Sequence, residues 1–399
     1  MDALTTPSNW QKVRLGDIAE IKRGASPRPI ENPKWFCANS NVGWVRISDI
    51  SKNSRFLYKT AQKLSKKGIE KSRFVKQNSL IMSMCATIGK PIITKIDTCI
   101  HDGFVVFENP KIDLNYLYYF LCYIEKEWLE SGQQGSQVNL NVDLIKNKEV
   151  FCPKDLNEQI AIANILSDVD RYLCALDALI LKKEGVKKAL SFELLSQRKR
   201  LKGFNQAWQK VRLGDICEFG NGGAYETLIV ENGNFKLISL NSIDIDGNLK
   251  NTMKRVNFYD NSLKQDDIVM VLSDVAHGDF LGLCAVIPSN DYVLNQRMGR
   301  LRKKNDCINI LFLRLYINAN QKYFKMQGQG SSQLNLSKKA IEDFEILLPP
   351  LNEQAAIANV LSGLDSEIAN LKNKKRQFEN IKKALNHDLM SAKIRVLNK

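Results

Sequence analysis

The chain has 399 residues, 44% of them hydrophobic, and a formal net charge of +15. This length allows two or three domains, and the charge favours nucleic acid or an anionic membrane surface as a partner; a basic protein without such a partner is the alternative. No stretch approaches the roughly 20 apolar residues of a membrane-spanning helix, and the first residues lack the basic and apolar regions of a signal peptide, so we expect neither.

The chain opens on a motif that returns in its second half. The eleven residues Trp10–Glu20 recur at 208–218 with ten identities, and the fifteen residues at 156–170 recur at 351–365 with eleven. The two motifs start 146 residues apart in the first copy and 143 apart in the second, while the intervening sequences differ almost throughout. One repeated frame with two different inserts favours two separate specificities, and neutral drift after a duplication is the alternative.

Each insert is predicted to be mixed α/β, because short β-rich runs lie between Gly, Asn, Asp and Pro turns. A helix-like stretch near the end of each insert precedes a loop rich in Gly, Gln, Ser and Asn. The predicted strands are 43–47, 79–83, 104–107, 235–239, 267–272 and 283–287, the helices 114–130 and 308–324, and the loops 131–141 and 327–335.

A long helix is predicted after each Leu-Asn-Glu-Gln motif, because apolar residues then recur at spacings of three and four. Each helix has about 40 residues, or roughly 60 Å. The apolar seam of the predicted coiled coil is interrupted by Lys183, Lys187, Lys375 and Lys382. This pattern is typical of a short coiled coil in which some stretches of the interface are polar and solvated. We expect the helices to pair antiparallel, and packing of each helix on its own insert is the alternative. The predicted coiled-coil interface consists of Leu166, Val169, Leu173, Leu176, Ile180, Leu361, Leu364, Ile368, Leu371 and Phe378.

These patterns predict an α+β fold. Two mixed α/β domains are separated by an antiparallel coiled coil of two long helices, with pseudo-twofold symmetry from the internal duplication. The predicted divisions are the first α/β domain at 1–150, a central helical spacer at 151–207, the second α/β domain at 208–345 and a C-terminal helix at 346–399.

Basic residues are concentrated in the first insert. Residues 10–150 carry 22 basic and 14 acidic side chains, whereas residues 208–345 carry 17 and 16. The run 52–76 and the cluster from Arg297 to Lys304 suit phosphate contacts, and a solvated protein face is the alternative. Base reading needs Arg for guanine and Asn or Gln for adenine, although each single candidate also fits a turn or cap. The DNA-binding candidates are Arg46, Ser48, Lys66, Lys67, Arg73, Gln137, Asn139, Asn241, His277, Gln296, Arg297 and Gln333.

Motifs for catalysis are absent from the sequence. The three histidines stand alone, and no P-loop or Asn-Pro-Pro-aromatic motif occurs. The nine cysteines form no Cys-x-x-Cys pair, which argues against a zinc site or a disulfide framework and favours a reducing cytoplasm. We therefore predict no catalytic residue and no metal ligand in this chain.

In combination, these motifs resemble the specificity subunit of Type I restriction–modification systems. The resemblance rests on Trp-x-x-Val-x-Leu-Gly-Asp-Ile at the start of each half, on Gly24-Ala-Ser-Pro27, and on proline followed by Leu-Asn-Glu-Gln and a long helix. The second copy departs from this pattern with Gly-Asn-Gly-Gly-Ala-Tyr at 220–225.

The resemblance implies a DNA-binding chain with two target-recognition domains, each reading one half of a split site in double-stranded DNA. It implies a coiled coil that sets the distance between half-sites, and two methyltransferase (M) and several restriction/translocase (R) subunits as partners in DNA methylation and restriction. This chain would carry no cofactor and would not be an enzyme, since S-adenosylmethionine, ATP and Mg²⁺ would belong to the partner subunits of the adenine methyltransferase/endonuclease complex.

Two other hypotheses stay open from the sequence. A self-sufficient nucleic-acid-modifying enzyme with a degenerate site in one insert predicts methyl transfer or cleavage by the chain alone. A purely structural coiled-coil adaptor predicts no salt-sensitive DNA binding.

Overall fold

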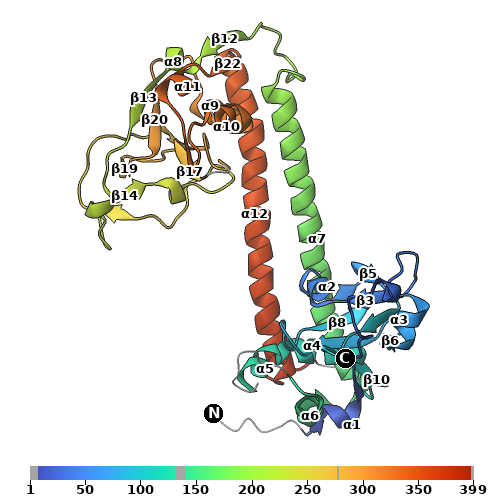
Figure 1. The fold of residues 1–399 in the computed structure, drawn as a ribbon. Helices are drawn as coiled ribbons and strands as arrows, with labels where there is room; N and C mark the ends of the chain where they lie inside the picture. Colours follow the sequence, from blue (N-terminus) through green and yellow to red (C-terminus); the bar gives the residue numbers. More distant parts are fainter. Residues whose placement is uncertain (1–7, 132–139, 276–277, 397–399) are drawn as a thin grey trace. The chain divides into compact units, whose positions relative to one another are not determined.

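The computed structural model describes residues 8–131, 140–275 and 278–396. The chain divides into two compact units: unit 1 comprises residues 1–177 and 373–399, and unit 2 comprises residues 178–372. Each unit contains an α/β domain and one part of each long helix, as Figure 1 shows.

The α/β domain of unit 1 is built around a five-stranded sheet that is buried on both faces. Its strand order is β2-β10-β7-β8-β4, and only β4 and β8 pair in parallel. Alternate side chains of β7 point to opposite faces, so Leu80 and Met82 join one apolar cluster while Ile81 joins another. Helix α4 adds Tyr116 and Leu117 to the first cluster. Burial on both faces explains why β7 is continuously apolar.

A second sheet of unit 1 has the order β5-β3-β9-β6, in which β3 and β9 are parallel. A further pair joins β1 to β11. The elements are β1 (Trp10–Arg14), α1 (Leu15–Ile18), β2 (Glu20–Arg23), η1 (Pro33–Trp35), β3 (Gly43–Val45), α2 (Ile47–Ser51), β4 (Phe56–Leu57), β5 (Gln62–Lys63), α3 (Lys66–Glu70), β6 (Arg73–Val75), β7 (Leu80–Ser83), β8 (Pro91–Thr94), β9 (Thr98–Ile100), β10 (Phe104–Glu108), α4 (Leu114–Tyr123), α5 (Glu125–Ser131), α6 (Val142–Asn147) and β11 (Glu149–Pro153).

Unit 2 has a similar but not identical order of elements. Its larger sheet has the order β13-β20-β16-β18, and in its three-stranded sheet β14 and β19 pair in parallel, as β3 and β9 do in unit 1. The elements are β12 (Gln209–Arg212), α8 (Leu213–Ile216), β13 (Cys217–Asn221), η2 (Glu226–Leu228), β14 (Phe235–Ile238), η3 (Leu240–Ser242), β15 (Arg255–Val256), β16 (Ile268–Val271), β17 (Ser273–Val275), β18 (Cys284–Val286), β19 (Tyr292–Leu294), β20 (Met298–Lys303), α9 (Ile310–Ala319), α10 (Gln321–Gln327), β21 (Gln333–Asn335), α11 (Lys338–Glu342) and β22 (Glu345–Leu348).

The predicted domain strands are present, and the predicted domain helices are each divided in two. The stretch at 43–47 is extended only to Val45, because α2 begins at Ile47. The stretch at 114–130 forms α4 and α5, and the stretch at 308–324 contains α9 and the start of α10. The division falls at Ile124 (φ −88°, ψ 4°) and at Asn320 (φ −110°, ψ 25°), where the backbone leaves the helical conformation.

The two long helices, α7 (Leu156–Leu195) and α12 (Leu351–Met390), pair antiparallel within each unit as predicted. In unit 1, Asp170 pairs with Lys382 at 2.5 Å, and Asp177 pairs with Lys375 at 2.6 Å. The ring centroids of Tyr172 and Phe378 lie 4.5 Å apart between these pairs.

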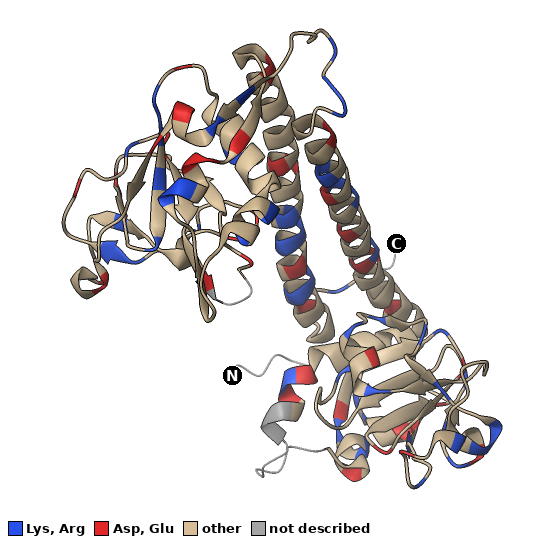
Figure 2. Ribbon diagram, turned by 45° about the horizontal axis from the view of Figure 1, so that its top comes forward, with Lys and Arg blue, Asp and Glu red and all other residues tan. Residues whose placement is uncertain are grey.

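In unit 2, Glu184 pairs with Lys372, and Lys183 pairs with Glu367, both at 2.8 Å. Lys187 pairs with Asp365. The lysines that interrupt the apolar seam therefore meet acidic partners on the opposite helix, and both signs of charge alternate along the two helices in Figure 2.

The predicted interface residues lie along these helices with different degrees of burial. Leu166 and Leu361 are fully buried, but they belong to the apolar clusters of the α/β domains. Leu176, Ile180 and Ile368 are 5–8% exposed. The remaining five are half-buried: Val169, Leu173, Leu364, Leu371 and Phe378.

The repeated motifs contact each other inside each unit. In unit 1, the indole N–H of Trp10 donates to Glu158 (3.2 Å), which also accepts from Asn9. In unit 2, the indole N–H of Trp208 donates to Glu353 at 3.1 Å, and Arg200 binds the same carboxylate through two nitrogens. The glutamate of Leu-Asn-Glu-Gln thus connects the long helix to the tryptophan that begins the other repeated motif.

Candidate nucleic-acid interface

A glycine turn follows β2 in unit 1 and lies against the end of β9. The N–H of Gly24 donates to the carbonyl of Phe104 (2.8 Å), and the N–H of Ala25 donates to the carbonyl of Ile100 (3.0 Å). A Cβ at Gly24 would lie 2.0 Å from the carbonyl oxygen of His101. Only glycine permits so close a backbone approach.

Unit 2 has the same turn after β13. The N–H of Gly222 donates to the carbonyl of Met298 (3.2 Å), and the N–H of Gly223 donates to the carbonyl of Leu294 (3.0 Å). A Cβ at Gly222 would lie 2.1 Å from the carbonyl oxygen of Asn295. The two turns, which we call the glycine clamps, are thus equivalent in backbone geometry although their sequences share little beyond glycine.

The side chains around the unit 1 clamp centre on Asp102. Its carboxylate accepts from the Ser26 hydroxyl (2.9 Å) and pairs with Arg28 (3.1 Å). Burial opposes ionisation, but the Ser26 hydrogen bond and the Arg28 charge hold the pKa of Asp102 below its usual value. Arg23 donates to the Asp102 carbonyl at 2.8 Å. The clamp therefore presents two arginines and one carboxylate.

His101 lies beside this carboxylate. Burial lowers the pKa of its imidazole despite the nearby Asp102, and its Nδ1 accepts from the N–H of Gly103 at 2.9 Å. Trp44 and Phe104 contact the ring at centroid distances of 5.9 and 4.6 Å. The ring is thereby fixed in one orientation.

The side chains around the unit 2 clamp differ completely. Asn295 donates to Glu226 at 2.9 Å and accepts from the N–H of Tyr225 at 3.1 Å. A hydrogen bond from Gln296, with smaller contributions from Asn295 and the charge of Arg297, lowers the pKa of the Glu226 carboxyl. A carboxylate thus stands where unit 1 has Arg28.

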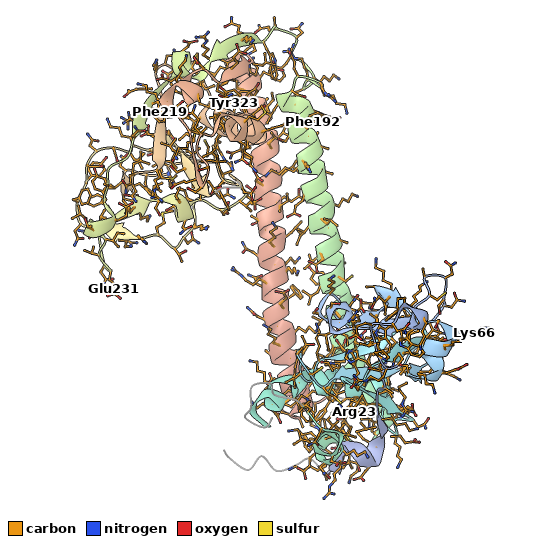
Figure 3. The ribbon with its side chains drawn as sticks, viewed as in Figure 1. Arg23, Lys66, Phe192, Phe219, Glu231 and Tyr323 are labelled. Carbon is orange, nitrogen blue, oxygen red and sulfur yellow. The ribbon has the colours of Figure 1, made fainter. Side chains whose placement is uncertain are left out.

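The candidates predicted in unit 1 lie after strand β3, on helices α2 and α3, and at the start of strand β6. Arg46 is exposed and donates to Gln62 at 2.8 Å, and Ser48 is exposed on α2. Arg73 donates to the carbonyl of Arg23 at 3.3 Å, which connects it to the clamp. Lys66 and Lys67 are exposed on α3, and Lys66 lies at the periphery of unit 1 in Figure 3.

The candidates predicted in unit 2 are less closely grouped. Gln296 and Arg297 are exposed next to the clamp, Asn241 is exposed on η3, and Gln333 is half-buried on β21. Three candidates lie outside the described residues: Gln137, Asn139 and His277.

Arg55 differs from the rest of the basic run 52–76. Its side chain is 7% exposed, and it donates to Tyr119 (2.9 Å), Ser167 (2.7 Å) and Asn115 (2.6 Å). Tyr119 in turn donates to Asp170 at 2.7 Å. The interpretation of the whole run as a phosphate-binding surface is therefore wrong for Arg55, which joins the domain to α7.

Sequence reasoning did not identify the clamps, Asp102 or Glu226 as parts of one site. The available signal was the glycine after the second strand of each half. Its contacts were not evident, because the residues that it meets lie some 75 positions further along the chain. Within the described residues, no group of three or more His, Cys, Asp and Glu side chains could hold a metal ion, and no helix there is long and apolar enough to cross a membrane.

Known proteins resemble the whole chain or part of it. It is 26% identical over 428 residues to the Type I restriction enzyme MjaVIII specificity subunit of Methanocaldococcus jannaschii, covering 100% of this chain and 96% of that protein. It is 24% identical over 168 residues to the Type I restriction enzyme EcoprrI specificity subunit of Escherichia coli, covering 40% and 41%.

The fold is shared with the crystal structure of the Type-I restriction-modification system S subunit from M. genitalium. The TM-score is 0.63 at 17% identity, and the match covers 97% of each chain. The model of the Type I restriction modification DNA specificity domain matches residues 7–183 and again residues 205–380. The duplicated frame is thus two copies of this domain, and the chain belongs to the Type I restriction–modification specificity subunit family.

Proposed function

We propose that the chain is the DNA-recognition subunit of a Type I restriction–modification enzyme and reads a split site, one half with each α/β domain. The observation that carries this proposal is the pair of glycine clamps. Their backbones are equivalent, whereas the side chains on them differ: His101 and Asp102 in unit 1 correspond to Asn295 and Gln296 in unit 2.

Hydrogen-bond donors and acceptors on a fixed backbone suit the reading of base edges. Unit 1 offers arginine donors next to the Asp102 carboxylate, and unit 2 offers Gln296 and Arg297 next to the Glu226 carboxylate. Two arrangements on one frame would select two different sequences. We accordingly propose residues 1–150 and 208–345 as the two target-recognition domains, with the helical segments 151–207 and 346–399 spacing them.

The paired helices support a scaffolding role. We propose that two M subunits and the R subunits assemble on this chain, that the apolar residues of the helix seam hold the spacing, and that the complex works in the cytoplasm. Methyl transfer and cleavage would then take place in the partners, with their S-adenosylmethionine, ATP and Mg²⁺, and this chain would supply DNA recognition.

Exchange of residues 10–150 for the corresponding insert of another specificity subunit tests whether each domain recognises its half of the site independently. We expect the recognised site to change in one half only, because the other domain keeps its own clamp and side chains. The measurement is sequencing of methylated sites in a host that carries the hybrid complex. A change in both halves would contradict the assignment of one half to each domain.

Replacement of Lys66 and Lys67 with alanine is expected to weaken DNA binding without changing the preferred sequence. Both lysines are exposed and have no ion-pair partner among the described residues. Each lost phosphate contact should flatten the plot of log affinity against log salt by about 0.9. Titrations of DNA at several salt concentrations measure this slope.

The charge control replaces Lys12 and Lys111, which are also exposed in unit 1 and remove the same charge; Lys12 differs from the tested lysines in that it pairs with Glu149 at 3.4 Å. Lys12 belongs to strand β1 and Lys111 to the loop before α4, both away from α3 in sequence. An equal flattening of the slope in both double variants would show that Lys66 and Lys67 act through the total charge of the protein and do not contact phosphates specifically.

A further inference from the structure

Arg297 has a backbone conformation that arginine seldom adopts. Its φ is +70°, in the left-handed region that glycine occupies readily. Unit 1 has Gly103 at the equivalent position: the carbonyl of Gly103 accepts from the N–H of Met84 at 2.8 Å, as the carbonyl of Arg297 accepts from the N–H of Leu272 at 2.9 Å. Gly103 itself lies outside the left-handed region, so the strained conformation belongs to unit 2, which carries arginine there in spite of the conformational cost. Unfavourable backbone conformations of this kind concentrate at binding sites.

Among the basic side chains from Arg297 to Lys304, that of Arg297 is free to bind a ligand. It is exposed and forms no hydrogen bond or ion pair with the described residues. Arg300 binds Glu218 at 2.8 Å, and Arg302 binds Asp267 through two nitrogens. Lys303 pairs with Asp306, and Lys304 donates to the carbonyl of Gly214. These four cations are occupied within the protein.

The surroundings of Arg297 favour a base edge over a phosphate. Glu226 lies close enough for the charge of Arg297 to act on it, and it is fixed by a hydrogen bond from Asn295 at 2.9 Å. A carboxylate repels a phosphate and cancels the local positive charge. An arginine beside a carboxylate can instead contact the edge of a base pair. Its guanidinium then donates two hydrogen bonds, to O6 and N7 of guanine.

We propose that Arg297 is the specificity-determining residue of the second domain, reading a guanine through two parallel hydrogen bonds. This inference rests on the proposed function and adds to it one residue, one base and one half of the site. The side chain is exposed to solvent, and the negative charge of Glu226 disfavours a backbone phosphate as its ligand.

The test is selection of binding sites from a random double-stranded DNA library. The full chain is purified from its host with the subunits bound to it and compared with Arg297→Gly, Arg297→Lys and the charge control Lys322→Ala on α10, which is exposed. We expect Arg297→Gly and Arg297→Lys to lose a guanine preference of roughly tenfold or more at one position of one half, with the other half unchanged. Lys322→Ala should retain the whole site.

Thermal unfolding verifies that the variants are folded, and Arg297→Gly should unfold at the same temperature or higher, because glycine relieves the backbone. A uniformly weaker but unaltered site would overturn the inference, since a phosphate contact behaves in that way. Failure of the unchanged chain to select any two-part site would instead overturn the proposed function itself.

Discussion

Replacement of Gln354 with alanine is expected to lower the free energy of unfolding by about 3 kcal/mol. The Gln354 side chain is fully buried; its Oε1 accepts from the N–H of Asn309 (2.8 Å), and its Nε2 donates to the carbonyls of Pro349 (2.8 Å) and Cys307 (3.0 Å). Alanine would remove the partner of three backbone groups, of which the Pro349 carbonyl is buried and the other two are partly buried, at about 1–3 kcal/mol each where water cannot enter. Urea unfolding followed by circular dichroism measures the loss.

The unit 1 counterpart provides a graded comparison. Gln159 binds the N–H of Asp113 (2.9 Å) and the carbonyl of Pro153 (2.8 Å), so Gln159→Ala should cost less than Gln354→Ala, about 2 kcal/mol. The control Asn359→Ala is exposed on the same helix as Gln354 and should change stability by less than about 0.5 kcal/mol. A loss below about 1 kcal/mol for Gln354→Ala would show that the motif does not hold the domain to its helix.

Replacement of Arg55 with alanine is expected to destabilise unit 1 by about 3 kcal/mol while leaving the salt dependence of DNA binding unchanged. The guanidinium packs over the ring of Phe56, 4.8 Å from its centroid, and over Tyr119 at 4.9 Å. Its removal takes away that packing and leaves Asn115 and Ser167 without their donor.

Arg55→Ala and the double variant of Lys66 and Lys67 should therefore have opposite phenotypes. The first lowers the unfolding temperature at constant salt slope, and the second flattens the slope at constant unfolding temperature. The two measurements together separate a structural arginine from binding lysines in the same basic run. If Arg55→Ala flattened the plot of log affinity against log salt and kept its stability, Arg55 would be a DNA contact and not a structural residue.

Local periodicity was sufficient to predict the long helices and most strands. The spacings of three and four along α7 and α12 depend on neighbours within each helix. The lysines that interrupt them, such as Lys382 and Lys375, are explained by their acidic partners Asp170 and Asp177. The division of 114–130 at Ile124 was not predictable, because apolar residues continue on both sides of it.

The site depended on long-range contacts that a single sequence does not specify. Gly24 meets His101, and Gly222 meets Asn295, across intervals filled by several strands. The unlike turn sequences concealed that the two backbones are equivalent. Arg55 was assigned to solvent with its neighbours because its partners Tyr119 and Ser167 lie 64 and 112 residues away. Charge patterns locate basic side chains, but not the partners that occupy them.

Unit 1 is formed by two separate segments of the chain, so it cannot finish folding until the ribosome has made both. Ile162 and Leu166 share a core with Leu389 and Met390, which emerge after the whole of unit 2. At 5–20 residues per second, the chain between these segments takes roughly 10–40 s to make. We expect the nascent unit 1 to expose that apolar surface to chaperones throughout this interval. The unit that is synthesised first is thus the last to be completed.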